Sequence, residues 1–256
     1  MSTAHFRFYA ELNDFLPVNQ RFREVQLPFQ GAQTVKHLVE SLGVPHTEID
    51  LILVNGESVD FAYRVQHEDR ISVYPVFEGF EIGSVNHLRP APLRNPTFVL
   101  DVHLGRLAAY LRLLGFDAIY QSNYDDEEIA RISHSQHRIC LTRDRGLLKR
   151  KQVTHGYCLR STDSRQQLRE VLQRFDLHQK IQPFSRCARC NGLLQEVEKQ
   201  TILNRLQEGT QQYYDDFWQC KVCGQVYWQG SHFQRLEKLI DWALTEEDAS
   251  MAGEHT

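Results

Sequence analysis

Hydrophobic and polar residues are arranged in two different ways along this chain, and the change falls near residue 97. Before that point, apolar residues come in short stretches that alternate with polar ones, as in half-buried strands. These stretches lie at 6–9, 22–29, 51–54 and 70–76. Between the second and third, Thr34 precedes an apolar face of helical period that Gly43 ends. One helix packed on a mixed sheet of this size is a β-grasp fold.

After residue 97, short apolar strands alternate with amphipathic helices. The expected strands are 98–100, 117–120, 139–142 and 156–159. The expected helices are 104–114, 126–132, 146–151 and 168–175. Strands that alternate with helices in this way form a parallel sheet with helices on both faces. The pattern therefore predicts a multidomain chain with an α+β part followed by an α/β part, joined by a proline-containing linker at 81–96.

Four cysteines in the C-terminal third form two Cys-x2-Cys pairs, Cys187 with Cys190 and Cys220 with Cys223. Two such turns supply a tetrahedral set of four thiolates, which suits structural Zn²⁺. The spacer between the pairs, residues 191–219, leaves room for a β-hairpin. The alternative is two disulfides or redox pairs, but nothing else in the chain looks secreted. The spacing predicts a zinc ribbon, which folds around its ion and leaves the chemistry to another part of the chain.

Composition narrows the class of protein. The 256 residues are 41% hydrophobic and 24% charged, which is ordinary for a globular protein of two or three domains. The first residues lack the pattern of a secretory signal, and no apolar run reaches about 18 residues. Cys140 and Cys158 lie in apolar strands and are expected to be buried, reduced thiols. We therefore expect a cytoplasmic protein without a membrane partner.

Three acidic residues follow strands of the predicted parallel sheet. Asp101 comes directly after the first strand, Asp126 follows the second and Asp144 follows the third. Ligands bind outside the carboxyl ends of such strands, and clustered carboxylates repel one another unless a cation lies among them. The pattern predicts a Mg²⁺ or Mn²⁺ site that activates water on a phosphodiester. Helix capping is the alternative role for Asp126, a plain turn is the alternative for Asp144, and Asp125 is an alternative ligand.

Charge is unevenly distributed along the chain. Residues 1–80 hold 6 Lys and Arg against 11 Asp and Glu, whereas residues 81–236 hold 22 against 16. A basic centre is compatible with a polyanion partner. The side chains expected to contact nucleic-acid phosphates are Arg106, Arg143, Arg145 and Lys149. A solvated helix face is the alternative for this basic cluster.

The stretches VNGESV at 54–59 and EDRISVYPV at 68–76 resemble the ThiS/MoaD-type ubiquitin-like family. Sulfur carriers of that family end in a free Gly-Gly, whereas this chain reads Glu78-Gly79-Phe80 and continues. The resemblance therefore implies a binding or packing role for the β-grasp domain, with a protein as its partner, in place of carrier chemistry.

The stretches DVHLGRLA at 101–108, LRLLGFD at 111–117 and LTRD at 141–144, followed by the two cysteine pairs, resemble the Mut-seven C-terminal RNase family. The resemblance implies a PIN-like nuclease domain fused to a zinc ribbon, and a metal-dependent ribonuclease activity. Asp101 and Asp144 match acidic positions of the PIN type, and we take Asp126 as the middle acid. The aromatic pair Tyr227-Trp228 offers rings on which single-stranded RNA can stack, although packing of the ribbon core is the alternative.

These inferences divide the chain into five parts. They are a ubiquitin-like domain at 1–80, a linker at 81–96, a PIN-like nuclease domain at 97–182, a zinc ribbon at 183–233 and a C-terminal helix and tail at 234–256. The leading hypothesis is a ribonuclease with structural Zn²⁺ and catalytic Mg²⁺ or Mn²⁺. One alternative is a non-catalytic RNA- or ribosome-binding protein. Another is a sulfur-transfer or tRNA-modification protein, which the β-grasp pattern and the cysteine pairs suggest.

Overall fold

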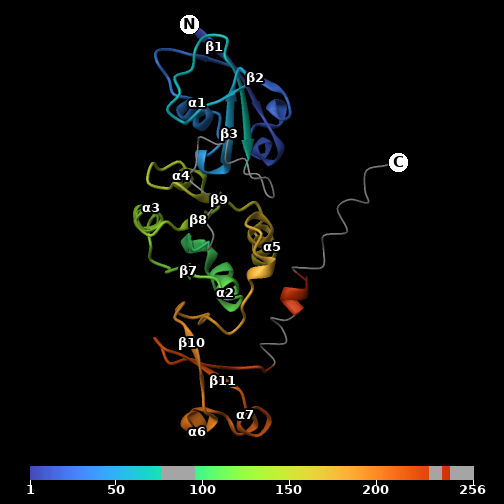
Figure 1. The fold of residues 1–256 in the computed structure, drawn as a ribbon, viewed down its shortest axis with the longest axis vertical. Coiled ribbons are helices and arrows are strands. Elements are labelled where there is room, and N and C mark those ends of the chain that lie inside the picture. The colour runs from blue at the N-terminus through green and yellow to red at the C-terminus, as the bar shows by residue number, and fades with distance from the viewer. Residues whose placement is uncertain (76–95, 231–237, 243–256) are drawn as a thin grey trace, which may run out of the picture. The chain divides into compact units, whose positions relative to one another are not determined.

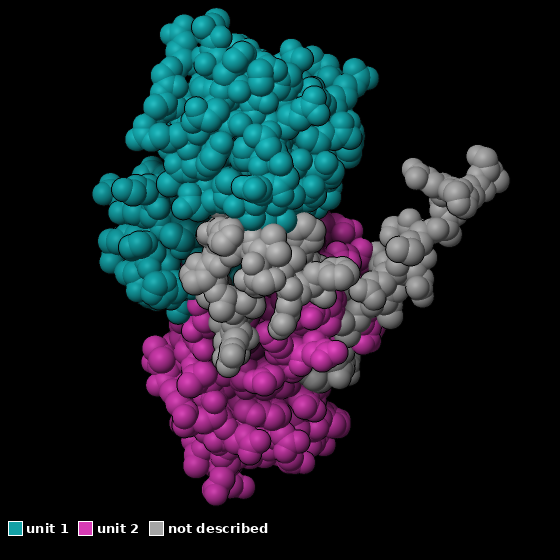
Figure 2. All heavy atoms as spheres, turned by 45° about the horizontal axis from the view of Figure 1, so that its top comes forward, with its two compact units in different colours: residues 1–95, 126–158 teal, residues 96–125, 159–256 magenta. Residues whose placement is uncertain are grey.

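The computed structural model describes residues 1–75, 96–230 and 238–242. The chain forms two compact units that each combine two parts of the sequence (Figure 2). Unit 1 comprises 1–95 and 126–158, and unit 2 comprises 96–125 and 159–256. The expected linker at 81–96 lies outside the described residues except for Pro96, and so does the tail beyond 242. Residues 238–242 are helical.

The N-terminal module of unit 1, residues 1–75, is the predicted β-grasp (Figure 1). Its strands are β1 (Ser2–Phe8), β2 (Glu24–Phe29), β3 (Ile49–Val54), β4 (Glu57–Ser58) and β5 (Arg70–Pro75). Its helices are α1 (Val35–Ser41) and the 3-10 turns η1 (Ala10–Phe15), η2 (Val18–Gln20) and η3 (His46–Glu48). The sheet order is β2-β1-β5-β3-β4, with β1 and β5 parallel at the centre.

Local sequence signals account for the turns of this module. The Thr34 hydroxyl accepts a hydrogen bond from the His37 amide at 3.3 Å and caps α1, as predicted. Asn55 and Gly56 have φ values of 52° and 93°, so the β3–β4 hairpin needs left-handed backbone at both positions. Asparagine and glycine tolerate that conformation best.

The rest of unit 1 is α/β. It contains α3 (Asp126–Ser135), β8 (Ile139–Thr142), α4 (Arg145–Leu148) and β9 (Gly156–Cys158), and β8 pairs with β9 in parallel. Gly156 allows α4 to pack on β9, because a Cβ there would lie 2.5 Å from a methyl carbon of Leu148. The helix expected at 146–151 is shorter than predicted, because it begins at Arg145 and Lys149 caps its end.

Unit 2 begins with β6 (Phe98–Leu100), the 3-10 turn η4 (Val102–Leu104), α2 (Gly105–Leu113) and β7 (Ala118–Ile119). It continues with α5 (Ser164–Arg174) and the short turn η5 (His178–Lys180). β6 and β7 are parallel, and α2 packs against α5. Phe98 of β6 contacts the residues that follow both helices. The centroid of its ring lies 6.5 Å from that of Phe116 and 5.7 Å from that of Phe175. The prediction of parallel strands that alternate with helices is confirmed in both units.

The C-terminal ribbon of unit 2 is a three-stranded antiparallel sheet of β10 (Leu194–Val197), β11 (Phe217–Cys220) and β12 (Val226–Trp228). The spacer forms the expected hairpin, but with α6 (Lys199–Ile202), η6 (Leu203–Arg205) and α7 (Glu208–Tyr213) inserted at its end (Figure 1). The ribbon core is small and consists of Ile202, Leu206, Phe217 and Val226. Such a core needs additional cross-linking to be stable.

No helix in the described residues combines the length and the apolar character needed to cross a membrane.

Candidate metal centre and nuclease site

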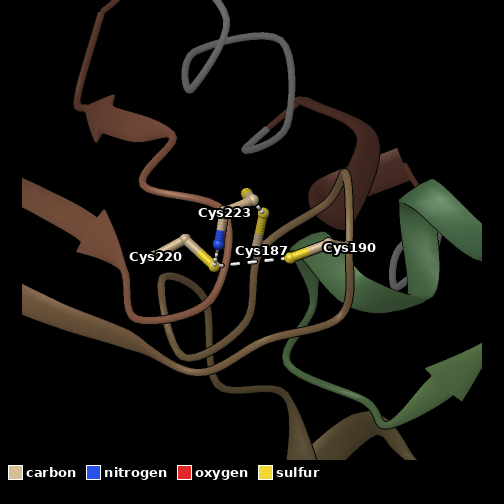
Figure 3. Close-up of side chains that lie close together, drawn as sticks. All are labelled: Cys187, Cys190, Cys220 and Cys223. Atoms are coloured by element: carbon tan, nitrogen blue, oxygen red, sulfur yellow. Dashed lines mark hydrogen bonds between the residues drawn. The ribbon is translucent and has the colours of Figure 1, made fainter.

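Four cysteine sulfurs converge in unit 2 (Figure 3). All four lie within 4.8 Å of one another, and two contacts join sulfurs of opposite turns. Cys190 and Cys220 are 3.4 Å apart, and Cys187 and Cys223 are 3.6 Å apart. A disulfide requires about 2.05 Å, whereas thiolates ~2.3 Å from a tetrahedral ion lie about 3.8 Å from one another. The geometry fits one tetrahedral ion, and the predicted four-cysteine cluster is confirmed.

The two cysteine turns are built alike. In the first, the Asn191 amide donates to the Cys187 carbonyl at 2.9 Å, and in the second the Gly224 amide donates to the Cys220 carbonyl at 3.0 Å. Asn191 and Gly224 both have positive φ values, 67° and 70°. Residues that tolerate left-handed backbone therefore close each turn and aim its two sulfurs at the same point.

Polar neighbours and burial shift the pKa values of Cys190 and Cys220 in opposite directions. Burial raises the pKa of the Cys190 thiol to about 12. Burial also opposes ionisation of Cys220, but hydrogen bonds from the amides of Cys223 and Val222 and from the thiols of Cys190 and Cys223 together outweigh it and lower the pKa of Cys220 to about 7. The Tyr227 hydroxyl lies 3.1 Å from the Cys187 sulfur. Because an ion must displace the remaining thiol protons, acid should compete with the metal.

The first cysteine turn is fastened to the α/β part of unit 2. Arg112, near the end of α2, is 5% exposed and donates to four carbonyls. Two belong to Ala188 and Arg189, inside the first cysteine turn, and two belong to Ala118 and Tyr120, in and after β7. The guanidinium thus bridges the metal cluster and the edge of the α/β part.

Asn191 provides a second attachment. Its side-chain nitrogen Nδ2 donates to the Asp117 carboxylate at 2.8 Å, and its side-chain oxygen accepts from the backbone amide of Ala118 at 3.1 Å. Arg186 completes an ion pair with Asp117 at 3.1 Å. The predicted zinc-ribbon segment is therefore packed onto the preceding domain through specific hydrogen bonds.

Asp101 follows β6 directly, as predicted, and is 8% exposed. Its carboxylate caps η4 by accepting from the His103 amide at 3.5 Å. Tyr120 supports the same loop, because its hydroxyl donates to the Val102 carbonyl at 3.0 Å. Gly105 leaves room for this tyrosine, since a Cβ there would lie 2.8 Å from the hydroxyl oxygen.

A pocket of about 390 Å³ opens beside this loop in unit 2. Residues from the start of α2 and the start of α5 line it, among them His103, Arg106, Tyr120, Thr162, Asp163 and Ser164. Its volume lies within the usual range for small-molecule sites of ~300–1,000 Å³. Asp163 caps α5 by accepting from the amides of Arg165 and Gln166.

Asp126 and Asp144 belong to unit 1. Asp126 opens α3, and its carboxylate lies 3.6 Å from the Arg150 guanidinium. Asp144 is exposed and caps α4, accepting from the Gly146 amide at 2.7 Å. Its own amide donates to the Thr142 hydroxyl at 2.9 Å, which fixes the turn after β8.

The four predicted nucleic-acid contacts fall into two groups. Arg106 and Arg143 are exposed. Arg145 is exposed as well, but its guanidinium donates to the carbonyls of Phe15 and Asp14 at 3.1 and 3.4 Å. Lys149 donates to the Glu40 carbonyl at 2.7 Å. The second group thus contacts the N-terminal module of its own chain.

Sequence reasoning assigned no role to Arg112, although a signal was present. Arg112 lies four residues after Ala108, so it falls at the edge of the apolar face of α2. A charged residue in that position is expected to be buried only when its donors are satisfied. The carbonyls that satisfy them come from residues 76 and 77 positions away, which no local pattern indicates.

The folds and the cluster together define a class of protein, in which a β-grasp module precedes an α/β domain that carries a four-cysteine metal-binding ribbon. Residues 96–240 match the family model of the Mut7-C RNAse domain, and residues 1–81 match that of the Mut7-C ubiquitin domain. Since the first match covers more than half of the chain, the protein belongs to the Mut7-C RNase domain family. Both sequence-based resemblances are confirmed, and the family suggests a nuclease that acts on RNA.

Two solved structures resemble the chain over a limited part of its length. The crystal structure of H. volcanii small archaeal modifier protein 1 is 18% identical, with a TM-score of 0.25, and the match covers 29% of this chain and 98% of that one. A second structure, of SAMP1 from Haloferax volcanii, gives the same identity and TM-score with 31% and 100% coverage. No curated protein matches the sequence.

Proposed function

We propose that this protein is a metal-dependent ribonuclease whose Mg²⁺ or Mn²⁺ ligands are Asp101, Asp126 and Asp144. The observation that carries the proposal is the Mut7-C RNase match over residues 96–240, which contains all three carboxylates. Carboxylate oxygens are the donors that these hard cations prefer. When bound, such an ion lowers the pKa of water and stabilises charge on the phosphate.

The local surroundings of the three carboxylates support this role. Asp101 and Asp144 are each fixed by an amide donor in the turn after a strand, so the chain has already oriented their oxygens. Preorganised ligands lose little entropy on binding. Asp126 is paired at 3.6 Å with Arg150 and would exchange that partner for the metal.

We further propose that single-stranded RNA approaches through the pocket beside Asp101. Arg106 and His103 line it together with the hydroxyls of Thr162 and Ser164, a set that suits phosphate and ribose groups. Arg143 is exposed beside Asp144 and is the second proposed phosphate contact. Arg145 and Lys149 direct their donors to carbonyls of the N-terminal module, so the RNA contacts proposed here are Arg106 and Arg143.

The four cysteines would hold Zn²⁺, because closely spaced thiolates in a tetrahedral arrangement prefer it. We assign it a structural role, since all four positions are filled by protein sulfurs and none is left for water. Stoichiometric zinc would also exclude the sulfur-transfer alternative, because metal-bound thiolates cannot relay sulfur.

The decisive experiment incubates the purified chain with end-labelled single-stranded RNA in Mn²⁺, Mg²⁺ or EDTA. We expect cleavage that requires the divalent ion and is lost in Asp101→Asn and Asp144→Asn. Asp176→Asn is the matched control, because Asp176 is exposed and remote in sequence from the three carboxylates. Cleavage that survives both active-site substitutions would reject the assignment. RNA binding without cleavage in any metal would favour the non-catalytic alternative.

A further inference from the structure

The N-terminal module (residues 1–75) contacts both ends of α4, the short helix that follows Asp144. The Arg145 guanidinium donates to the carbonyls of Phe15 and Asp14, and it lies 4.9 Å from the centroid of the Phe15 ring. A guanidinium over an aromatic face gains a cation–π attraction in addition to its hydrogen bonds. Phe15 is 5% exposed, so its ring is held in place by the module that presents it.

A second contact fixes the other end of the helix. Lys149 is the C-terminal cap of α4, and its ammonium donates to the Glu40 carbonyl at 2.7 Å. The Glu40 carboxylate in turn lies 2.7 Å from one nitrogen of His46, whose other nitrogen lies 2.9 Å from the Val153 carbonyl. His46 is 5% exposed, so this bridge is shielded from water.

A third contact lies at the end of β9. The Glu48 carboxylate, on η3 of the module, accepts a hydrogen bond from the Cys158 amide. Glu48 is 1% exposed. Burying a carboxylate costs free energy unless the group is well paired. Breaking the contact with the Cys158 amide would remove a partner from this buried group. The burial therefore indicates a permanent contact.

From these three contacts we propose that the N-terminal module is a built-in docking partner of residues 144–158, and that Arg145 and Lys149 are positioning residues for Asp144. Asp144 itself makes the proposed metal contact. The link to catalysis rests on the proposed function above, whereas the docking does not.

The length of α4 explains why positioning is needed. The helix spans Arg145–Leu148, about one turn, and helices this short are not stable by themselves. Its orientation must come from packing and from contacts at its ends. The module supplies one contact at the first residue and one at the cap, so it fixes the turn in which Asp144 directs its carboxylate.

The competing interpretation is that Arg145 and Lys149 bind RNA phosphates, as their basic cluster suggests. RNA would then have to displace three hydrogen bonds to carbonyls and one aromatic contact. Arg143 lies two residues away and, like Arg145, is exposed and positively charged. It therefore serves as the matched comparison for a side chain that meets phosphate.

The test uses the full chain with four substitutions. Arg145→Gln and Phe15→Leu remove the two sides of the docking contact. Arg143→Gln and Phe22→Leu are their controls, since Phe22 is a 64% exposed ring of the same module. Amide hydrogen exchange of residues 146–149 reports on α4, and the salt dependence of single-stranded RNA binding in EDTA reports on phosphate contacts.

We expect Arg145→Gln and Phe15→Leu to accelerate α4 exchange about 3- to 10-fold, from the loss of a cation–π contact and hydrogen bonds. The controls should leave it unchanged. Arg143→Gln should reduce the salt slope by about one, and Arg145→Gln should not. The proposal is overturned if Arg145→Gln reduces the slope as Arg143→Gln does while α4 exchanges at the wild-type rate.

If Phe15→Leu unfolds the module, Arg145→Lys decides. It keeps the charge but cannot reach both carbonyls, so faster α4 exchange with an unchanged salt slope is expected, and wild-type exchange would overturn the proposal. Cleavage assays test separately whether Arg145 affects catalysis. With an active enzyme, Arg145→Gln should lower kcat and leave KM unchanged. If no variant cleaves RNA, the ribonuclease assignment fails, while the exchange rates still decide the docking.

Discussion

The Arg112 guanidinium donates to the Ala188 carbonyl at 3.2 Å, which ties helix α2 to the turn between the first two cysteines. Burial lowers the pKa of Arg112, while the thiols of Cys190 and Cys187 act in the opposite direction. Arginine nevertheless remains charged in proteins. Four thiolates around one divalent ion carry an excess of negative charge, and this buried cation offsets part of it.

Arg112→Gln should therefore weaken zinc binding. Replacing residues that orient metal ligands from outside the ligand set typically costs about 10- to 100-fold in affinity. Competition with a chromophoric chelator would measure the change. Arg189→Gln is the control. It removes the same charge, but Arg189 is an exposed residue of the first cysteine turn. Equal effects of both substitutions would show that only net charge matters.

Zinc content should depend on the cluster and not on the other two cysteines. Purified protein is expected to contain one zinc per chain by elemental analysis, Cys220→Ala should lose it, and Cys158→Ala should keep it. Cys158 is also buried, but it lies in β9 of unit 1. Because the ribbon core is small, metal removal should raise amide exchange in β10, β11 and β12 before it affects the N-terminal module. Equal zinc loss in both cysteine variants would contradict this assignment.

Local chemistry explains which parts of the fold could be predicted. The Thr34 cap, the Asn55-Gly56 turn and the two cysteine turns each follow from a few adjacent residues, and the structure confirms them. The helices inserted in the ribbon spacer were not foreseen, because α6 is about one helical turn long, too short for an apolar period to appear.

Long-range contacts explain what the sequence did not reveal. The basic cluster predicted phosphate contacts for Arg145, yet its partners are 130 and 131 positions away in the N-terminal module. Charge pattern alone cannot distinguish a carbonyl of the same chain from a phosphate. The acidic site remains a prediction, since its three carboxylates belong to two units.

His5 should make the stability of the N-terminal module depend on pH. Its ring nitrogens lie 2.9 Å from Glu24 and 3.2 Å from Glu68, and these hydrogen bonds raise the pKa of His5 above its ordinary value. Stabilisation from a raised pKa is complete below the unfolded value of about 6.5 and is lost as pH rises through the folded value. His5→Gln should therefore lower stability at pH 6 and have little effect at pH 8.5.

Histidine NMR of the full chain would measure this pKa directly, and thermal unfolding at the two pH values would measure the stability. His37→Gln is the control, since His37 is exposed on α1. A His5 pKa at or below 6.5, or a destabilisation of equal size at both pH values, would show that the two carboxylates do not stabilise the charged ring.

Gly115→Ala should strongly destabilise unit 2, because two separate costs coincide there. Gly115 ends α2 with a φ of +95°, a left-handed conformation that costs an L-residue about 1–2 kcal/mol. A Cβ would also meet the Gln182 carbonyl and lie 2.6 Å from the Ser185 hydroxyl oxygen, and such overpacking adds about 1–3 kcal/mol.

Gly31→Ala separates the two costs. Gly31 also has a positive φ, +71°, but a Cβ there meets nothing within 4 Å. Gly31→Ala should incur only the cost of placing an L-residue in left-handed backbone, so its midpoint of unfolding should fall less than that of Gly115→Ala. Thermal unfolding with separate probes for the two units would make the comparison. Equal losses would mean that the segment around Gln182 moves aside, and that the α2 terminus does not depend on the close approach seen here.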